Sequence, residues 1–146
     1  MRLEAPGARD PRWLALRIRL WPGSEADHLP YMDDAIARGH FVRLAIASSG
    51  SAVGFVEASK RVDYVNGTNS SPVAFLEGLF VEPASRGNGV ARALVAAVEG
   101  WALAQGFTEL ASDSPLESVS AHAVHRALGF EETERVVYFR RALRGA

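Results

Sequence analysis

The chain has 146 residues, of which 48% are hydrophobic, and its 16 basic and 17 acidic side chains leave a formal net charge of -1. This size predicts a single domain, residues 1–146, with a sizeable core. The near-neutral charge argues against binding to nucleic acid, and no apolar run is long enough to span a membrane. Because the chain has no cysteine and no signal-peptide core at its amino terminus, we expect a cytoplasmic protein without disulfides.

Hydrophobic periodicity and turn residues predict strands and helices that alternate along the whole chain. In chain order we expect a short strand at 1–5, helices at 12–21 and 31–37, hairpin strands at 41–47 and 52–62, a polar loop at 63–72, a strand at 73–81, a helix from Val90 to a stop at Gly106, a short strand at 107–112, a helix at 114–130 and a final strand at 135–141. This order predicts a mixed α/β fold.

Two of these elements carry distinctive local signals. The run at 73–81 is the most strand-like in the chain and is expected to be central, and Gly78 inside it predicts a bulge or a close backbone approach. In the last predicted helix, Ser114 is expected to be the N-cap and Pro115 the first helical residue. Gly129 is expected just past the end of that helix.

The glycine-rich stretch RGNGV, 86–90, lies between a predicted strand and a predicted helix. A glycine turn that enters a helix presents unpaired backbone N–H groups at the positive end of the helix dipole. Its glycines let a ligand approach the backbone closely, and its arginine adds a charged donor. The stretch lacks the Lys-Ser/Thr pair of a nucleoside-triphosphate loop and the third glycine of a dinucleotide fingerprint. We interpret it as a diphosphate cradle, with a plain structural turn as the alternative.

RGNGVA at 86–91 and VHRALGF at 124–130 together resemble two motifs of the GNAT family of N-acetyltransferases. RGNGVA, 86–91, fits the family's Arg/Gln-x-x-Gly-x-Gly/Ala loop, and VHRALGF, 124–130, resembles its helix-ending pattern with His125 in place of a tyrosine. LWPG, DYVNG, FLEGLFV and GFEETERVVYFR further resemble the chromosomal-type aminoglycoside 6'-N-acetyltransferases. The resemblance implies a GNAT fold, with a mixed central β-sheet flanked by helices.

The resemblance also implies an activity. The protein is expected to transfer an acetyl group from acetyl-coenzyme A to the 6'-amine of an aminoglycoside, by direct attack in a ternary complex, and so to give antibiotic resistance. A polyamine or protein amine is the alternative acceptor, and a non-catalytic acyl-coenzyme A-binding module is the alternative class of protein. The family resemblance further suggests a homodimer.

Individual site residues follow from the same resemblance. Coenzyme binding is expected at Val81, Arg86, Gly87, Asn88, Gly89, Val90, Ala91, Ser118 and His125. Substrate binding is expected at Trp21, Tyr64, Glu77, Asp113 and Glu134. Ser118 stands where the family often has an asparagine that contacts the pantetheine arm, and a serine can still form a hydrogen bond there.

Glu77, Asp113 and His125 are the candidate catalytic residues. An alkylamine has a pKa near ~10.4, so it arrives as an ammonium and must lose a proton, which a carboxylate can accept through water. His125 replaces the tyrosine usually proposed to protonate the departing thiolate. As alternatives, Glu77 is a satisfied buried polar group, Asp113 a helix cap, and His125 a helix-end residue packed beside Phe130.

Other polar and aromatic residues have equally plain alternatives. Trp21 precedes a proline and fits a core anchor at a turn, whereas Glu134 belongs to an acidic run that is typical of a solvated face. The remaining histidines show no metal-ligand spacing, so we expect no metal site.

Overall fold

The computed structural model describes residues 1–145 and divides into two compact units, Met1–Asp113 and a second that begins at Ser114. The first unit contains a five-stranded sheet of order β1-β2-β3-β4-β5, in which only the β4–β5 pair is parallel. The strands are β1 (Arg2–Glu4), β2 (Phe41–Ile46), β3 (Ala52–Arg61), β4 (Val73–Val81) and β5 (Leu110–Ser112). The helices are α1 (Pro11–Leu20), α2 (Glu25–Ala37), the 3-10 turn η1 (Pro83–Ser85), α3 (Val90–Ala104) and α4 (Val119–Ala127). The predicted mixed α/β fold is confirmed.

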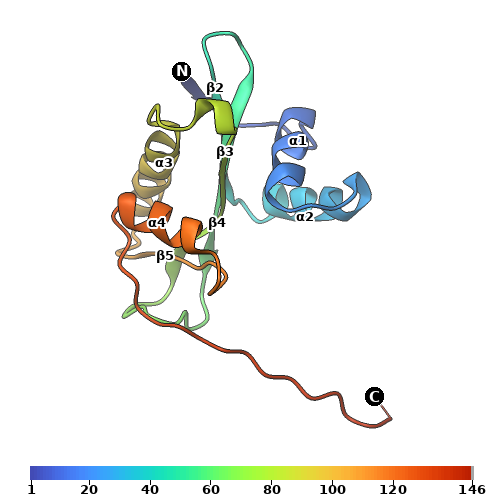
Figure 1. Ribbon diagram of the computed structural model, residues 1–146, viewed down its shortest axis with the longest axis vertical. Helices are drawn as coiled ribbons and strands as arrows, with labels where there is room; N and C mark the ends of the chain where they lie inside the picture. The colour runs from blue at the N-terminus through green and yellow to red at the C-terminus, as the bar shows by residue number, and fades with distance from the viewer. Residues whose placement is uncertain (146) are drawn as a thin grey trace. The chain divides into compact units, whose positions relative to one another are not determined.

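Within the first unit, α1 and α2 cover one face of the sheet and α3 covers the other (Figure 1). The core on the α1–α2 face consists of Trp13, Leu14, Leu16, Met32, Ala35, Val42, Leu44, Ile46 and Phe55. On the other face, Val90, Leu94 and Val98 of α3 are buried at helical spacing, as their periodicity predicts. The sheet therefore lies between two apolar layers, and polar side chains inside these layers need partners.

The second helix begins at Glu25, six residues before the expected start at Tyr31, so that prediction was wrong. Its first turn is held by a capping box, in which Ser24 and Asp27 each bond the other's backbone N–H. This arrangement satisfies two donors that a helix end leaves unpaired. Pro30 lies inside the helix, where proline is usually disfavoured, and this obscured the first turns in the sequence.

The bulge and the close approach expected at Gly78 are both present. Glu57 of β3 faces Gly78 and Ala58 faces Leu76, so Glu77 is an extra residue on β4 without a facing partner. A Cβ on Gly78 would lie 2.4 Å from Cη2 of Trp21, which only glycine allows. The strand lies between β3 and β5, an interior position as expected.

Two predicted boundaries were wrong. The strand expected at 107–112 contains only Leu110–Ser112, because the N–H of Phe107 bonds to the carbonyl of Ala102 and so closes the end of α3. Similarly, the last helix begins at Val119, with Ser118 at the N-cap, rather than at Ser114.

Residues 115–118 of that region instead form a turn, in which the N–H of Ser118 donates to the carbonyl of Pro115 at 3.0 Å. Gly129 lies past the end of α4 with a φ of 93°, which confirms its expected place.

The final strand expected at 135–141 is absent from the described chain. Val137, Tyr138 and Phe139 are 66%, 84% and 92% exposed. Their residue types favour a strand, but a strand also needs a neighbouring strand to pair its backbone N–H and C=O groups. Residues 135–141 have no strand assignment in the described chain, so they lack such a pairing.

Candidate active site

The glycine-rich loop has the backbone that its sequence predicts. Gly87 and Gly89 have φ angles of 82° and 80°, and beyond the adjacent residues no atom lies within 4 Å of the place where a Cβ would stand on either. Gly89 is also the N-cap of α3, so the first N–H groups of that helix open onto the loop. Arg86 is anchored because its Nε donates to the carbonyl of Val81 at 2.9 Å. The loop is therefore an open backbone surface of the kind that binds a phosphate.

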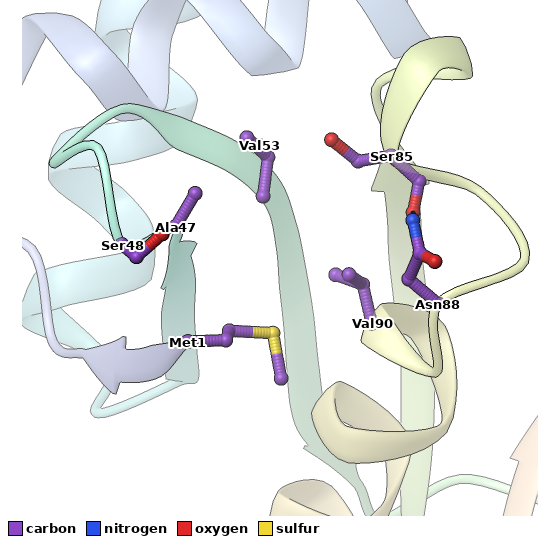
Figure 2. A pocket seen from close by; sticks show the side chains of 7 residues that line it. All are labelled: Met1, Ala47, Ser48, Val53, Ser85, Asn88 and Val90. Carbon is purple, nitrogen blue, oxygen red and sulfur yellow. Dashed lines mark hydrogen bonds between the residues drawn. The ribbon is translucent and has the colours of Figure 1, made fainter.

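A small pocket of about 230 Å³ adjoins this loop. Figure 2 shows Ser85, Asn88 and Val90 on one side of it and the side chains of Met1, Ala47 and Ser48 on the other. The Asn88 amide also reaches the carbonyl of Ser85, at 3.4 Å. None of the side chains that line the pocket is charged, so these side chains offer no ion pair to a phosphate, whereas Arg86 of the loop does.

A larger cavity of about 480 Å³ lies in the first unit. It is lined by Arg17, Trp21, Pro22, Gly23, Asp27, His28, Tyr31, Asp34, Ala35, His40, Glu57 and Glu77. Two of the predicted substrate residues, Trp21 and Glu77, thus share one cavity. Its lining contains four carboxylates but only one arginine, and this composition suits a cationic ligand with apolar ring faces.

Glu77 is held in the cavity wall by neighbours on β3. Its Oε1 accepts a hydrogen bond from Ser59 Oγ at 2.5 Å, and Arg61 binds both carboxylate oxygens at 2.9 to 3.2 Å. The bulge places this residue out of the regular alternation of β4. With a side chain 28% exposed, Glu77 is both fixed in position and accessible to a ligand.

Asp27 is a second carboxylate in the cavity lining, at the first turn of α2. The backbone N–H and the hydroxyl of Ser24 lower the pKa of Asp27 below its ordinary value. This carboxylate therefore stays ionised over a wider range of pH than an unpartnered one.

Sequence reasoning missed a buried polar network behind the same cavity. Arg17 Nε donates to Glu57 Oε2 at 2.6 Å, and Trp13 Nε1 donates to the same oxygen at 3.0 Å. Arg17 Nη1 also lies 2.9 Å from His28 Nδ1. Arg17, His28 and Glu57 are only 7%, 5% and 3% exposed. The available signal was an arginine on the apolar face of α1 together with a glutamate inside a strand of core residues.

The other predicted site residues of the first unit lie outside the cavity lining. Tyr64 lies in the loop after β3 and is 72% exposed, and Asp113 is an exposed residue directly after β5. The alternative interpretation of Asp113 as a helix cap does not hold, because α4 begins at Val119 with Ser118 at its N-cap. Within the first unit, the structure therefore gathers Trp21 and Glu77 in the cavity and residues 86–91 in the loop.

Ser118, His125 and Glu134 belong to the second unit. His125 Nδ1 lies 2.7 Å from the carbonyl of Ala121, and because a carbonyl only accepts, Nδ1 carries a proton. Its ring also packs edge-on against Phe130, with 5.4 Å between the ring centres. This packing agrees with the alternative interpretation of His125 as a helix-end residue beside Phe130. A neutral His125 thus has its N–H engaged, so donation from Nε2 requires the imidazolium form.

The acidic run after α4 is exposed, as a solvated face would be. Glu132 pairs with Arg135 at 2.5 Å and with Arg126 at 3.2 Å. Hydrogen bonding from Arg135 is the main cause that lowers the pKa of Glu132. Glu134 is exposed within the same run.

In residues 1–145, no group of three or more His, Asp or Glu side chains is arranged to hold a metal ion. Among the helices of these residues, none combines the length and the apolar character that crossing a membrane requires.

Comparison with known proteins relates these features to a family. The model of the Acetyltransferase (GNAT) family matches residues 11–130. The aminoglycoside N(6')-acetyltransferase type 1 of Stenotrophomonas maltophilia is 53% identical over 141 residues, which cover 96% of this chain and 92% of that protein.

Solved structures show the same similarity. The aminoglycoside antibiotic 6'-N-acetyltransferase AAC(6')-Ih from Acinetobacter baumannii matches with a TM-score of 0.93 and 46% identity, over 97% of this chain and 98% of that one. AAC(6')-Iy, in complex with the bisubstrate analog CoA-S-monomethyl-acetylneamine, matches with a TM-score of 0.88 and 42% identity, over 98% of this chain and all (100%) of that one.

Proposed function

Because the chain belongs to the acetyltransferase (GNAT) family, we propose that it transfers an acetyl group from acetyl-coenzyme A to the 6'-amine of an aminoglycoside. The observation that carries this proposal is the acidic cavity that holds Trp21 and Glu77. An aminoglycoside is a polycation built of sugar rings, so it needs carboxylates for its ammonium groups and an aromatic surface for its rings. The names of the similar proteins support the same acceptor.

The coenzyme is proposed to bind at the glycine-rich loop. The backbone of Gly87, Gly89 and the first turn of α3 faces open space, and it suits a diphosphate there. Arg86 adds a charge. We assign further coenzyme contacts to Val81, Asn88, Val90, Ala91, Ser118 and His125.

The reaction requires a deprotonated amine. The substrate amine nitrogen forms a C–N bond to the thioester carbonyl carbon, the C–S bond breaks, and the nitrogen loses a proton. We assign binding of the ammonium and acceptance of this proton, through water, to Glu77 and Asp113. The departing thiolate has a solution pKa near ~8.5 and needs only modest help, for which we propose His125. Direct transfer in a ternary complex fits a chain without cysteine.

The remaining substrate contacts are proposed at Trp21, Tyr64 and Glu134. We also propose that the two compact units belong to one acetyltransferase domain, residues 1–146, because the family match at 11–130 crosses their boundary at Asp113. The protein is proposed to act in the cytoplasm, where it would give aminoglycoside resistance.

We further propose a homodimer. The exposed apolar residues Val137, Tyr138 and Phe139 lie in a segment whose composition favours a strand. Pairing with a second copy would supply the missing backbone partners and cover these side chains.

A matched pair of aminoglycosides tests the acceptor. Two compounds that differ only in a 6'-amine or a 6'-hydroxyl are incubated with acetyl-coenzyme A and the enzyme, and thiol release is followed. We expect release only with the 6'-amine. Equal release with both compounds would place the reaction at another amine, and release only with spermidine or a peptide amino terminus would overturn the aminoglycoside assignment. Binding of acetyl-coenzyme A without release for any acceptor would indicate a non-catalytic module.

A further inference from the structure

The buried network of Arg17, His28 and Glu57 has no role in the reaction described above. All three residues line the cavity, although each is more than nine-tenths buried. Arg17 reaches Glu57 through two nitrogens, Nε at 2.6 Å and Nη2 at 3.3 Å, so the buried carboxylate and the buried guanidinium neutralise each other. This pairing leaves Glu57 engaged within the protein and makes it a poor partner for a substrate ammonium.

The hydrogen bonds determine the tautomer of His28. A guanidinium has only donors, so Nδ1 of His28 accepts from Arg17 Nη1 at 2.9 Å. The proton of the neutral ring is then on Nε2, which donates to the carbonyl of Trp21 at 2.7 Å. A second proton on Nδ1 would break the bond to Arg17 and bring two cations together. His28 therefore links the α1 arginine to the backbone of Trp21 only as the neutral Nε2–H form.

Trp21 is held on several other sides. The Arg17 guanidinium lies 4.7 Å from the centre of its ring, and Phe55 packs edge-on against it at 6.1 Å. The missing side chain of Gly78 leaves the space that the outer edge of the indole fills. An aromatic ring that is fixed before a ligand arrives loses little freedom on binding.

We infer that Arg17, His28 and Glu57 are positioning residues that hold Trp21 in place as the aromatic wall of the acceptor cavity. This inference rests on the proposed function, because it assumes that the cavity receives the acceptor. The network acts through Trp21 and does not touch the reacting atoms. Loosening it should therefore weaken acceptor binding while leaving the coenzyme and the chemical step nearly unchanged.

The variant His28→Phe tests this role, since it keeps a ring but removes both hydrogen bonds. We expect the KM for the aminoglycoside to rise about ten-fold, roughly the factor that one hydrogen bond of ordinary net strength represents. The kcat and the KM for acetyl-coenzyme A should stay within about two-fold. His122→Phe is the matched control, because His122 also bonds a backbone carbonyl, that of Pro115 at 3.0 Å, but does not line the cavity. An unchanged acceptor KM in folded His28→Phe, or an equal rise in both variants, would overturn the inference.

A measurement on the wild-type protein keeps the test decisive if His28→Phe fails to fold. Nitrogen-15 NMR of labelled histidine should show a protonated Nε2 and an unprotonated Nδ1 for His28 near neutral pH. A protonated Nδ1 would overturn the positioning role whatever the substrate is. If instead the tautomer is confirmed but no aminoglycoside is acetylated, the proposed function fails and the network does not.

Discussion

The strand β4 and the segment at 135–141 have similar strand-forming compositions but different structures. β4 lies between β3 and β5, and most of its side chains are buried. The segment at 135–141 contains valines, a tyrosine and a phenylalanine, yet it is exposed along its whole length and forms no strand. A strand-forming composition therefore produces a strand only where a neighbouring strand pairs with its backbone.

The same contrast extends to the acidic side chains of these two regions. Glu77 on β4 is held by Ser59 and Arg61, whereas Glu134 lies exposed in the acidic run before the C-terminal segment. Hydrogen bonds from neighbouring strand residues fix the orientation of the Glu77 carboxylate. We therefore expect turnover to depend on Glu77 far more than on Glu134.

The largest expected effect is the loss of turnover in Glu77→Gln. We expect kcat to fall by about 100-fold or more, because removal of a proton acceptor typically costs this much. The loss should be greatest at low pH, where more of the amine is protonated, and affinity for acetyl-coenzyme A should be unchanged. Steady-state kinetics across pH provide the measurement, with Glu131→Gln as the control, because Glu131 is exposed in the acidic run and has no role in the proposed site. Similar kcat and pH profiles for the two variants would reduce Glu77 to a structural role.

The next effect concerns the coenzyme loop. Acetyl-coenzyme A should raise the Tm of the wild type, and Gly89→Val should lose most of this rise because its side chain blocks the backbone N–H groups. Gly106→Val is matched to it, since Gly106 also has a positive φ, 87°, but lies at the other end of α3. Both variants should be less stable on their own, which thermal melts without coenzyme will show. A full coenzyme shift in folded Gly89→Val would contradict the cradle.

Gly78→Ala tests the close packing of β4 against Trp21. The added Cβ would meet the indole at 2.4 Å, so we expect unfolding to be easier by roughly 1–3 kcal/mol. Gly100→Ala is the control, because nothing lies within 4 Å of its Cβ position in α3 and it should stabilise by roughly 0.5–1 kcal/mol. Denaturant unfolding of both variants gives the comparison. Equal changes in the two would show that the indole moves aside readily.

His125→Ala should cost less than about 100-fold in kcat, since a thiolate needs little help to leave. The Nδ1 proton of His125 is engaged with the carbonyl of Ala121, which also argues for a modest role. Kinetics and thermal melts of the same variant separate the possibilities. A larger loss with normal coenzyme affinity would show a true acid role, and a lower Tm with unchanged kcat would favour packing beside Phe130.

The smallest effect on the single chain is expected from Phe139→Asp. The side chain is 92% exposed, so the substitution should change the stability of an isolated chain by less than about 0.5 kcal/mol. In the proposed homodimer it should instead halve the molar mass measured by light scattering. Leu103→Asp is the control. Leu103 is also an exposed apolar residue, but it lies in α3, so this substitution should leave the molar mass unchanged. A monomeric wild type would refute the dimer.

The sequence alone determined those features whose causes are local. Gly87 and Gly89 adopt positive φ angles in the loop, which glycine tolerates without strain. Apolar residues at helical spacing predict the helix that follows these glycines. Two apolar strands around a short turn predict the hairpin of β2 and β3. Even the irregularity at Gly78 was visible, because a glycine inside a core strand is conspicuous.

Tertiary structure decided the features that depend on partners distant in the chain. Arg17 and Glu57 form an ion pair although they are 40 positions apart in the sequence. No local pattern indicates which buried acidic residue pairs with a given buried basic residue. Tyr64 and Asp113 resemble family site residues, and the structure places both in exposed positions outside the cavity lining, which no local pattern indicates. The C-terminal segment shows the same limit, since its strand pattern is local whereas the hydrogen bonds of a strand must come from another one.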